Sequence, residues 1–361
     1  MKQLMFLEPG VFEWHEVPMP RLTSDTQALV KPLAVTRCDL DLYIANGAFP
    51  MKGPFAFGHE IAGEVIDVGD KVTNVSPGDR VIVPFQISCG HCSQCLRGHT
   101  NACESVPQFS AYGLAPSSGQ DWGGGLSDLI LVPFANAMLV PIPYGLSLVD
   151  AAAMSDNAID GYRTVAEPLQ KYPGTPVLVV GGLAQSVGLY AAKAALALGA
   201  SRVEYRDFDE RRLAAAISLG ADALMTSYDT DGSANGEFFV TVEASGTPKG
   251  LTYALRATAP CGICTSVSAG TGSIANVPLR EMYMKGIEYN VGRVHARGAL
   301  TNLIQSNICH SFCAHDLIDR TIPFSQAGET MADPNIKTVY LADEAETISE
   351  ATDSKISSKL N

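Results

Sequence analysis

Residues 177–188 read VLVVGGLAQSVG, four aliphatic residues that run into a glycine-rich turn. A short aliphatic run without polar alternation is typical of a strand that is buried on both faces of a parallel sheet. The next residues, 186–198, are rich in Ala and Leu and contain no Pro, and no Gly after Gly188. The stretch therefore predicts a buried strand at 177–180, a tight turn and a helix that crosses back over a sheet.

The same alternation continues downstream of this unit. Further strands are expected at 202–206, 238–243 and 262–267, and further helices at 209–219 and 251–258. Strands that alternate with helices in this way build a doubly wound parallel sheet with helices on both faces. The second half of the chain is therefore predicted to be an α/β domain.

The first 150 or so residues follow a different pattern. Short strands are expected at 28–33, 60–68 and 80–84, separated by turns that contain Gly and Pro. An Ala-rich helix near 148–153 leads into the α/β region. From about Gly292 the regular alternation is lost, which indicates a return to the first, mostly β domain, and residues 342–361 are expected to form a flexible tail.

Composition narrows the class of protein. The 361 residues are 46% hydrophobic and 17% charged, which favours two domains with cores of their own and excludes disorder. Asp and Glu number 38 against 25 Lys and Arg, a net charge of −13. Such a surface repels nucleic-acid backbones and anionic lipids, so we expect a small-molecule partner, no nucleic acid and no membrane. Because no apolar run resembles a signal peptide or a membrane span, we expect a cytoplasmic protein.

Four cysteines lie close together in the first domain: Cys89, Cys92, Cys95 and Cys103. Four thiolates at this spacing can close a tetrahedral shell around Zn²⁺ and leave no open position, which is the pattern of a structural zinc site. Buried free thiols are the alternative, but a loop offers little apolar interior to cover them. His91 lies inside the motif and is expected to stay outside the zinc shell.

A second set of metal donors is more dispersed. Cys38 and the motif Gly58-His59-Glu60 supply a thiol and an imidazole, and a third donor is expected far along the chain. A catalytic zinc takes three protein ligands and keeps one position open for a substrate oxygen. Taken singly, Cys38 and His59 have a plainer interpretation as core residues. Cys38 and His59 therefore indicate a zinc site only in combination with the other motifs.

Together these residues resemble the zinc-dependent medium-chain alcohol dehydrogenases. The likeness rests on Cys38, on the stretches GHEIAGEV at 58–65 and GDRV at 78–81, and on the four-cysteine lobe, and it extends to about Leu341. It implies two zinc ions per chain and a homodimer or homotetramer. It also implies a GroES-like catalytic domain at 1–157 with the structural zinc lobe at 89–103, a Rossmann domain at 158–291 and a return to the catalytic domain at 292–341.

The resemblance assigns the ligands of the catalytic zinc to Cys38, His59 and Asp156. In the family the third ligand stands six residues before an aromatic that opens the interdomain helix, and here Asp156 stands six residues before Tyr162. One thiolate, one carboxylate and one neutral imidazole make the zinc with its ligands formally neutral. Such a zinc acidifies a bound alcohol effectively.

Around these ligands the resemblance implies further roles and shows one departure. Asp41 would orient the ligand histidine, Glu60 would approach the metal, and Phe85 would line the substrate pocket, although core packing explains Phe85 equally well. Leu40 stands where the family has the Ser or Thr that passes on the alcohol proton, and Tyr43 replaces a His. Because leucine cannot carry a proton, Tyr43, a chain of water molecules or Glu60 would have to do so, or the reaction differs from simple alcohol oxidation.

The glycine-rich turn is an imperfect dinucleotide fingerprint. In the pattern G-x-G-x-x-G, Leu183 and Gln185 stand at the positions of the first two glycines, and only Gly188 is kept. Small residues nearby still admit a diphosphate at the N-terminus of the following helix, whose dipole attracts anions. Contacts are expected from Gly181, Gly182, Ala184, Ser186 and Val187.

Asp207 ends the second strand of the α/β domain, nineteen residues after Gly188. A carboxylate there accepts hydrogen bonds from the ribose hydroxyls of NAD and repels the 2′-phosphate of NADP, so NAD is the expected cofactor. The neighbouring Arg206, Arg211 and Arg212 keep NADP as a less favoured alternative. The resemblance adds Arg212 as a contact to the adenosine ribose and Lys337 as a contact to the diphosphate. Solvated surface cations are the alternative for Arg212 and Lys337. Arg293 is expected on the nicotinamide side.

Four cysteines remain. Cys261 and Cys264 fall on a predicted buried strand, and Cys309 and Cys313 fall on a predicted helix. Both spacings suit a metal or a redox disulfide, but we expect these thiols to pack as small apolar side chains.

These features and the resemblance predict an NAD-dependent zinc alcohol dehydrogenase, which moves a hydride between NAD(H) and a small secondary alcohol, polyol or carbonyl compound. Two alternatives stay open. A zinc-family reductase that uses NADPH on an activated C=C or C=O bond would explain Leu40 and the arginines. A crystallin-like protein that binds the cofactor without turnover would explain the altered glycines, but it would not need to keep an open metal site.

Overall fold

The computed structural model describes residues 1–229, 236–268 and 275–343 of the chain. The chain divides into two compact units. Unit 1 contains Met1–Asp156, His295–Gly298 and the described residues from Ile318 onward, and unit 2 contains Asn157–Val294 and Ala299–Leu317. Residues 292–294 and 299–317 thus lie in unit 2, whereas the sequence placed the whole of 292–341 in the first domain. One reason is that the hydroxyl of Tyr190 donates to the carbonyl of Ala314 at 3.0 Å. Most of the expected tail at 342–361 lies outside the described residues.

Unit 2 is built on a six-stranded parallel sheet with the strand order β11-β10-β9-β12-β13-β14. Its strands are β9 (Val177–Val180), β10 (Val203–Asp207), β11 (Asp222–Met225), β12 (Phe238–Glu243), β13 (Thr258–Ser266) and β14 (Glu288–Val291). All four residues of β9 are buried, as the aliphatic run predicts. The strand order reverses at β9, so β9 and β12 flank the switch point where sheets of this kind bind ligands.

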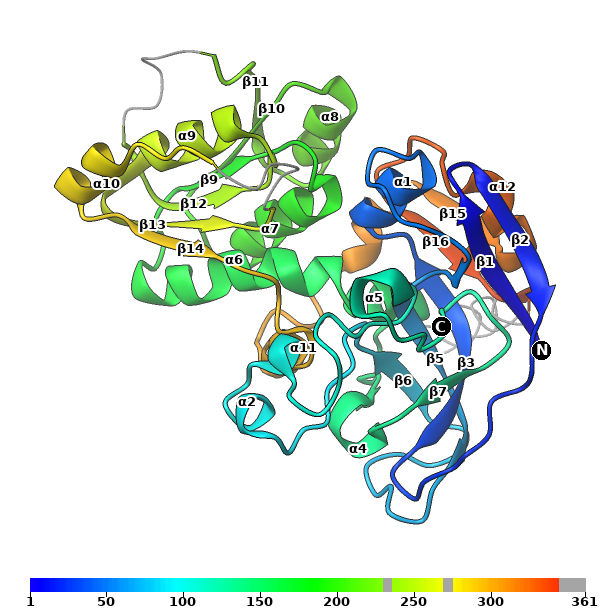
Figure 1. Cartoon of the computed structure of the whole chain (residues 1–361). Helices are drawn as coiled ribbons and strands as arrows, with labels where there is room; N and C mark the ends of the chain where they lie inside the picture. Colours follow the sequence, from blue (N-terminus) through cyan, green and yellow to red (C-terminus); the bar gives the residue numbers. More distant parts are fainter. Residues whose placement is uncertain (230–235, 269–274, 344–361) are drawn as a thin grey trace, which may run out of the picture. The chain divides into compact units, whose positions relative to one another are not determined.

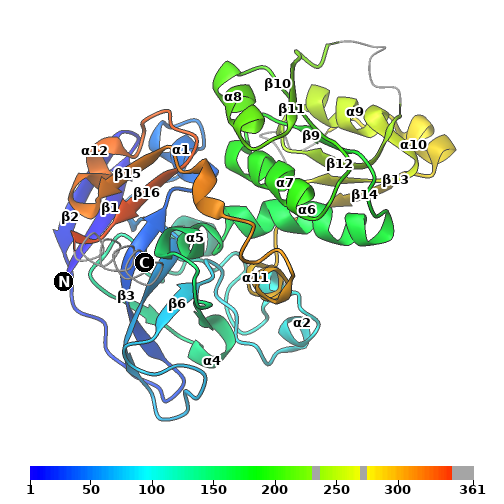
Figure 2. The ribbon, with the colours of Figure 1, turned by 180° about the vertical axis from the view of Figure 1, so that it is seen from behind.

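Helices cover both faces of this sheet. The helices of unit 2 are α6 (Asn157–Lys171), α7 (Gln185–Ala197), α8 (Glu210–Ser218), α9 (Pro248–Ala257) and α10 (Leu279–Lys285). The 3-10 helix η2 (Ala314–Leu317) also belongs to unit 2, and α11 (Ala296–Gln305) begins in unit 1 and ends in unit 2. Helices α6 and α7 pack on one face, and α9 packs on the other (Figures 1 and 2). The side chain of Asp209 caps α8 by accepting from the backbone N–H groups of Arg211 and Arg212, which fixes where the arginines leave the helix.

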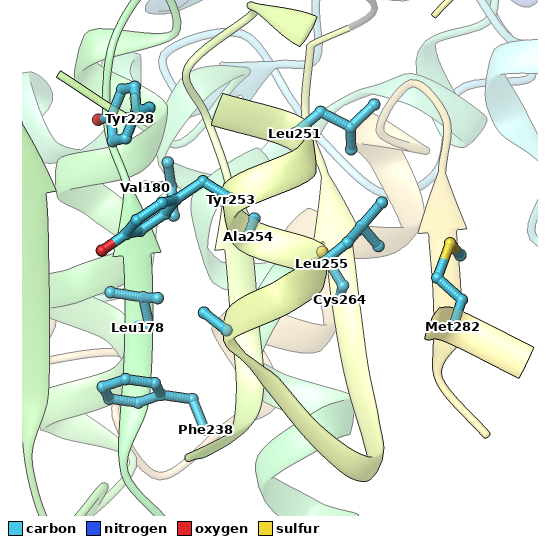
Figure 3. Packing of buried hydrophobic residues seen from close by; sticks show 11 residues of the cluster. Leu178, Val180, Tyr228, Phe238, Leu251, Tyr253, Ala254, Leu255, Cys264 and Met282 are labelled. Atoms are coloured by element: carbon cyan, nitrogen blue, oxygen red, sulfur yellow. The ribbon is translucent and has the colours of Figure 1, made fainter. Parts of the chain in front are cut away.

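The core between the sheet and α9 contains two tyrosines (Figure 3). Leu178 and Val180 project from β9 toward α9, where they meet Tyr253 and the adjacent Tyr228. The rings of Tyr228 and Tyr253 are 5.4 Å apart. Each hydroxyl has a hydrogen-bond partner, as buried tyrosines require. The polar ends of this core therefore lie near the last residues of β9 and β10.

Unit 1 is mostly β. A three-stranded sheet has the order β2-β1-β4, and a seven-stranded sheet has the order β15-β16-β3-β5-β6-β8, with β7 paired to β3. The strands are β1 (Lys2–Glu8), β2 (Val11–Glu16), β3 (Ala28–Thr36), β4 (Phe55–Ala56), β5 (Glu60–Val68), β6 (Arg80–Val83), β7 (Ile130–Val132), β8 (Val140–Pro141), β15 (Arg320–Pro323) and β16 (Thr338–Leu341). The helical elements are short: α1 (Asp39–Ala45), α2 (Ser93–Leu96), η1 (Thr100–Ala102), α3 (Ala115–Ser118), α4 (Ala135–Met138), α5 (Leu148–Ala153), η3 (Phe324–Gln326) and α12 (Ala327–Thr330).

The predicted fold class, an α/β doubly wound domain with a mostly β domain, is confirmed. Strands expected at 60–68, 177–180 and 238–243 have the observed bounds of β5, β9 and β12. The helix expected around Cys309 and Cys313 is wrong, because α11 ends at Gln305 and the chain continues in turns. Cys261 also differs from expectation: it lies on β13 but is exposed, at a register shift where its φ is +60°.

Among the described residues, no helix combines the length and the apolar character that crossing a membrane would require.

Candidate metal centre and cofactor site

The first donor set is assembled in unit 1, where β3 passes into α1. Cys38 occupies the N-cap position of α1, and its backbone N–H donates to the carboxylate of Asp41 at 3.0 Å. This reciprocal cap fixes the first turn of the helix, so the Cys38 thiol and the Asp41 carboxylate are held near one another. Both residues are buried.

His59 and Asp156 complete the set from two other elements of the same unit. His59 directly precedes β5, and Asp156 follows α5. Ser155 connects them, since its hydroxyl accepts from the backbone N–H of Ile61 at 2.9 Å and donates to the carbonyl of Ala152 at 2.7 Å. One donor atom from each of Cys38, His59 and Asp156 lies within 4.8 Å of the others.

The histidine ring is aligned by a carboxylate on each side. Nδ1 of His59 lies 3.3 Å from Oδ1 of Asp41, and Nε2 lies 3.4 Å from Oδ2 of Asp156. Burial lowers the pKa of His59, but the charges of Asp41 and Asp156 outweigh it and bring the pKa to about 9. Burial raises the pKa of Cys38 well above its usual range, and the nearby acids add to this. The thiolate form of Cys38 is therefore favoured only when a cation lies beside it.

These donors fit Zn²⁺. A thiol sulfur, an imidazole nitrogen and a carboxylate oxygen are the atom types that zinc takes, and three of them leave a fourth position open. Because Asp41 faces Nδ1 of His59, Nε2 is the ring nitrogen on the side of Asp156, as a ligand histidine with a carboxylate partner requires. The structure thus brings the expected ligands together with the expected orienting acid.

Glu60 lies beside this cluster in a buried ion pair. The ammonium of Lys337 lies 2.8 and 2.7 Å from the two carboxylate oxygens of Glu60, and the hydroxyl of Thr36 donates to the same carboxylate. Glu60 and Lys337 are both fully buried. Burial raises the pKa of Glu60 to about 7, although the charge of Lys337 acts in the opposite direction. From the sequence, Lys337 was expected to contact a diphosphate; in the structure its ammonium contacts Glu60.

The expected pocket residues have different surroundings. Phe85 is buried, and its ring centroid lies 5.6 Å from that of His59, so it forms an apolar wall beside the donor set. Leu40 and Tyr43 are half-buried residues of α1. They are three positions apart and therefore share one face of the helix.

The four-cysteine lobe is also assembled as expected. Ligand sulfurs of Cys89, Cys92, Cys95 and Cys103 all lie within 4.8 Å of one another. Backbone N–H groups in the lobe point at these sulfurs, for instance from Cys92 to Cys89 at 3.3 Å and from Glu104 to Cys92 at 3.4 Å. Such N–H groups stabilise thiolates, as a structural zinc site needs. Within the described residues, the two donor sets are the only groups of this kind, and neither includes the remaining four cysteines.

In unit 2 the glycine-rich turn lies between β9 and α7. A Cβ atom on Gly181 would come within 2.3 Å of Oδ2 of Asp207 and of the hydroxyl of Tyr205, so only glycine fits there. Gly182 has a φ of +149°, and a Cβ there would meet the backbone of Ser245 at 2.6 Å. Ala184 is the N-cap of α7, and Ser186 and Val187 are buried in its first turn.

Asp207 is fully buried at the end of β10 and is saturated with donors. Arg212 binds it in a forked pair, with Nε 2.8 Å from Oδ2 and Nη2 2.7 Å from Oδ1. The backbone N–H groups of Phe208 and Asp209 donate to Oδ1 at 2.6 and 3.0 Å, and the hydroxyl of Tyr205 lies 3.1 Å from Oδ2. The guanidinium of Arg212 also stacks on the half-exposed ring of Phe208 at 5.0 Å. Arg293 is exposed in unit 2.

Sequence reasoning missed two residues of this region, Tyr205 and Tyr228. The alternation of β10 contained a signal for the first, because Val203, Tyr205 and Asp207 fall on one face of a strand. Tyr228 lies in the loop after β11, where no periodic pattern points to the site.

Comparison with known proteins agrees with this geometry. Residues 24–144 match the family model of the alcohol dehydrogenase GroES-like domain. The chain is 32% identical over 240 residues to the glutathione-independent formaldehyde dehydrogenase of Pseudomonas aeruginosa, a match that spans 63% of this chain but only 59% of that protein. It is also 32% identical over 228 residues to the medium chain reductase/dehydrogenase ucsI of Acremonium sp., which covers 62% of this chain and 75% of that one.

A solved structure supports the same assignment. The alcohol dehydrogenase TADH from Thermus sp. ATN1 superposes with a TM-score of 0.85 at 26% identity, over 95% of this chain and 100% of that chain. The chain belongs to the medium-chain dehydrogenase/reductase family.

Proposed function

We propose that the chain is a zinc-dependent oxidoreductase that transfers a hydride between NAD(H) and a small secondary alcohol or polyol. The observation that carries the proposal is the buried trio of Cys38, His59 and Asp156, whose donor atoms lie within 4.8 Å of one another. The relatives named formaldehyde dehydrogenase and alcohol dehydrogenase favour small oxygen-containing substrates.

The trio would hold a Zn²⁺ ion with one open position. Bound there, zinc would act as a Lewis acid on the substrate oxygen, and NAD would accept the hydride. Asp41 keeps the His59 ring in place from the side opposite Asp156, so that Nε2 stays directed at the site. Phe85 excludes water from one side of the donor set and offers an apolar surface to the carbon skeleton of the substrate.

The alcohol proton has to leave without the hydroxyl that Leu40 replaces. We assign this task to Tyr43, which shares a face of α1 with Leu40 and carries a hydroxyl that can accept and donate a proton. Replacement of Tyr43 by Phe should then lower kcat by about 100-fold near neutral pH, the lower end of the contribution of a positioned proton-transfer group, with little change in KM. An unchanged kcat would move the task to water or to Glu60.

NAD is proposed rather than NADP because Asp207 ends β10, as in sheets that bind the ribose hydroxyls through a carboxylate. Gly181 and Gly182 leave the turn before α7 without side chains, which suits a close approach of the diphosphate.

Zinc content and turnover test the proposal together. The purified chain should carry two zinc ions, Cys38→Ala should carry one and lose NAD reduction, and Cys92→Ser should lose the other zinc. Cys264→Ala is the matched control, because Cys264 is fully buried but belongs to neither donor set, and it should keep both ions. A wild-type chain with one zinc or none, or a chain that reduces NAD with no alcohol in a broad panel, would refute the proposal.

A further inference from the structure

Two tyrosines approach the ends of β9 and β10 from opposite faces of the unit 2 sheet. Tyr205 projects from β10 on the side of α7, where a Cβ on Gly188 would lie 3.7 Å from its ring. Tyr228 packs on the side of α9, beside Val180 and Tyr253 (Figure 3). Both are buried, and both hydroxyls reach the point where the two strands diverge. The ends of β9 and β10 are therefore contacted by a tyrosine hydroxyl from each face of the sheet.

The hydroxyl of Tyr205 acts on the carboxylate of Asp207. It lies 3.1 Å from Oδ2, and both atoms occupy the space next to Gly181 that a Cβ would need. A phenol next to a buried carboxylate can only donate, so this hydroxyl holds one oxygen of Asp207 against the glycine turn.

The hydroxyl of Tyr228 acts on the backbone of the two strand ends. It lies 2.8 Å from the carbonyl oxygen of Gly181 and 2.8 Å from that of Arg206, and the N–H of Gly181 donates to the same Arg206 carbonyl. Tyr228 has a φ of +61°, a conformation that bulky residues rarely adopt. Its surroundings must therefore hold it there, and they direct its hydroxyl at the turn.

Asp207 cannot receive a ribose while all its present donors stay. A carboxylate has about four lone-pair positions, and Asp207 already meets two backbone N–H groups, Tyr205 and both arms of the Arg212 fork. The backbone donors are fixed by the chain, and the Tyr205 ring is packed under α7. Arg212 alone is the end of a flexible side chain. The ribose hydroxyls must therefore replace Arg212, which leaves Tyr205 as the side chain that keeps the carboxylate in place.

We propose that Tyr205 and Tyr228 are positioning residues of the dinucleotide site. Tyr205 fixes the Asp207 carboxylate for the ribose hydroxyls, and Tyr228 fixes the Gly181 turn for the diphosphate. The proposal rests on the proposed function, in that it takes NAD as the cofactor. It predicts different effects for the two hydroxyls: loss of the first weakens NAD alone, because NADP has no 2′-hydroxyl to offer Asp207, whereas loss of the second weakens both dinucleotides.

The test is calorimetric titration of the zinc-loaded chain with NAD and with NADP, in the absence of substrate. Tyr205→Phe should raise the Kd for NAD about tenfold, as expected for one hydrogen bond to a charged group, and leave the Kd for NADP within about twofold. Tyr228→Phe should raise both values by a similar factor of about ten. In an Asp207→Asn background the effect of Tyr205→Phe on NAD should disappear, because the hydroxyl acts through that carboxylate.

Tyr190→Phe is the matched control. Its hydroxyl is equally buried and donates to the carbonyl of Ala314 at 3.0 Å, away from β9 and β10, so both Kd values should stay at wild type. Unfolding temperatures recorded for each variant show that it is folded before titration. If the wild type binds NAD and the two variants bind like the control, the positioning proposal is refuted while the function stands. If the wild type binds neither dinucleotide, both are refuted.

Discussion

Replacement of Lys337 by Met tests how strongly the buried ion pair stabilises unit 1. The ammonium of Lys337 has Glu60 as its carboxylate partner at 2.7 and 2.8 Å, and both residues are completely buried. Without the ammonium, the Glu60 carboxylate keeps the Thr36 hydroxyl but loses its counter-charge. Breaking a buried pair from one side costs about 3–5 kcal/mol, because the partner that is left either keeps an uncompensated charge in a medium of low polarity or has to take up a proton.

Tryptophan fluorescence reads out this change selectively. The chain has two tryptophans, Trp14 and Trp122, and both belong to unit 1. Fluorescence during urea unfolding therefore follows the unit that contains the pair. With an m-value of about 2 kcal/mol/M, the Lys337→Met variant should unfold at a urea concentration lower by about 1.5–2.5 M.

Two further variants make the result interpretable. In the double variant Glu60→Gln/Lys337→Met neither charge of this pair is left buried, so most of the lost stability should return. Lys71→Met removes the ammonium of a pair with Asp25 in the same unit, in which the side chains are 71% and 57% exposed, and should change the free energy of unfolding by less than about 1 kcal/mol. A single variant as stable as wild type, or a double variant no more stable than the single one, would refute the electrostatic argument.

Four other outcomes are expected. Thr338→Val should leave the free energy of unfolding unchanged or raise it by about 1 kcal/mol in the same fluorescence assay, because the buried Thr338 hydroxyl has no hydrogen-bond partner in the described part of the chain; a loss above that size would contradict this. Gly181→Ala should lower the calorimetric unfolding temperature and abolish NAD binding, since its Cβ would lie 2.3 Å from two oxygens, whereas Gly292→Ala, with nothing within 4 Å of its Cβ, should change neither. Leu40→Thr should raise kcat for alcohol oxidation about tenfold at neutral pH by adding a hydroxyl to the proton path; an equal or lower kcat would count against that path. Brief treatment with a strong chelator should remove the zinc of the three-ligand site before that of the four-cysteine lobe, and metal analysis that finds the opposite order would contradict the division into open and closed sites.

Central strands of the α/β unit could be located from the sequence, whereas its edge strands could not. β9 is buried at every residue, so its aliphatic run is unambiguous. β11 and β14 form the two edges of the same sheet, and each has one half-buried residue among exposed ones. A strand that contacts the core on so little of its surface needs no apolar pattern, so composition alone does not reveal it.

The expected helix at Cys309 and Cys313 failed for a related reason. Ile308 and Phe312 are both buried and four residues apart, which imitates one face of a helix. The segment instead closes single turns, in which the N–H groups of Ser311 and Phe312 both bond to the carbonyl of Ile308. Apolar spacing reports which side of a segment is buried, and over so few residues it does not report whether the turns continue.

Both sets of candidate metal donors could be predicted from the sequence, but for different reasons. The four cysteines lie close together in the sequence, whereas the positions of the other set came from a family resemblance. The four cysteines span 89–103 and need no knowledge of the fold. Asp156 lies far from Cys38 and His59 in sequence, and residue types alone do not single it out from the other acids. The resemblance supplied that position, and the structure places its carboxylate 3.4 Å from His59.

The contact between Lys337 and Glu60 follows from the register of three strands and not from a sequence motif. Lys337 lies 277 residues from Glu60 in sequence. In the sheet of unit 1, Val339 on β16 is opposite Thr36 on β3, and Thr36 is opposite Glu60 on β5. Opposite residues project to the same face, and so do residues two positions apart on one strand, which places Lys337 on the face of Thr36 and Glu60.

Arg37 secures this register from the other face. Its guanidinium donates to the carbonyls of Met331, Asp333 and Asn335, the residues that lead into β16. Arg37, which has no assigned role in the reaction, thereby holds β16 against β3. The same strand register places the ammonium of Lys337 beside Glu60, the acid next to the candidate metal donors. Given the strand order, the contact between Lys337 and Glu60 follows from counting residues along three strands; without the strand order, Lys337 cannot be told apart from a solvated surface lysine.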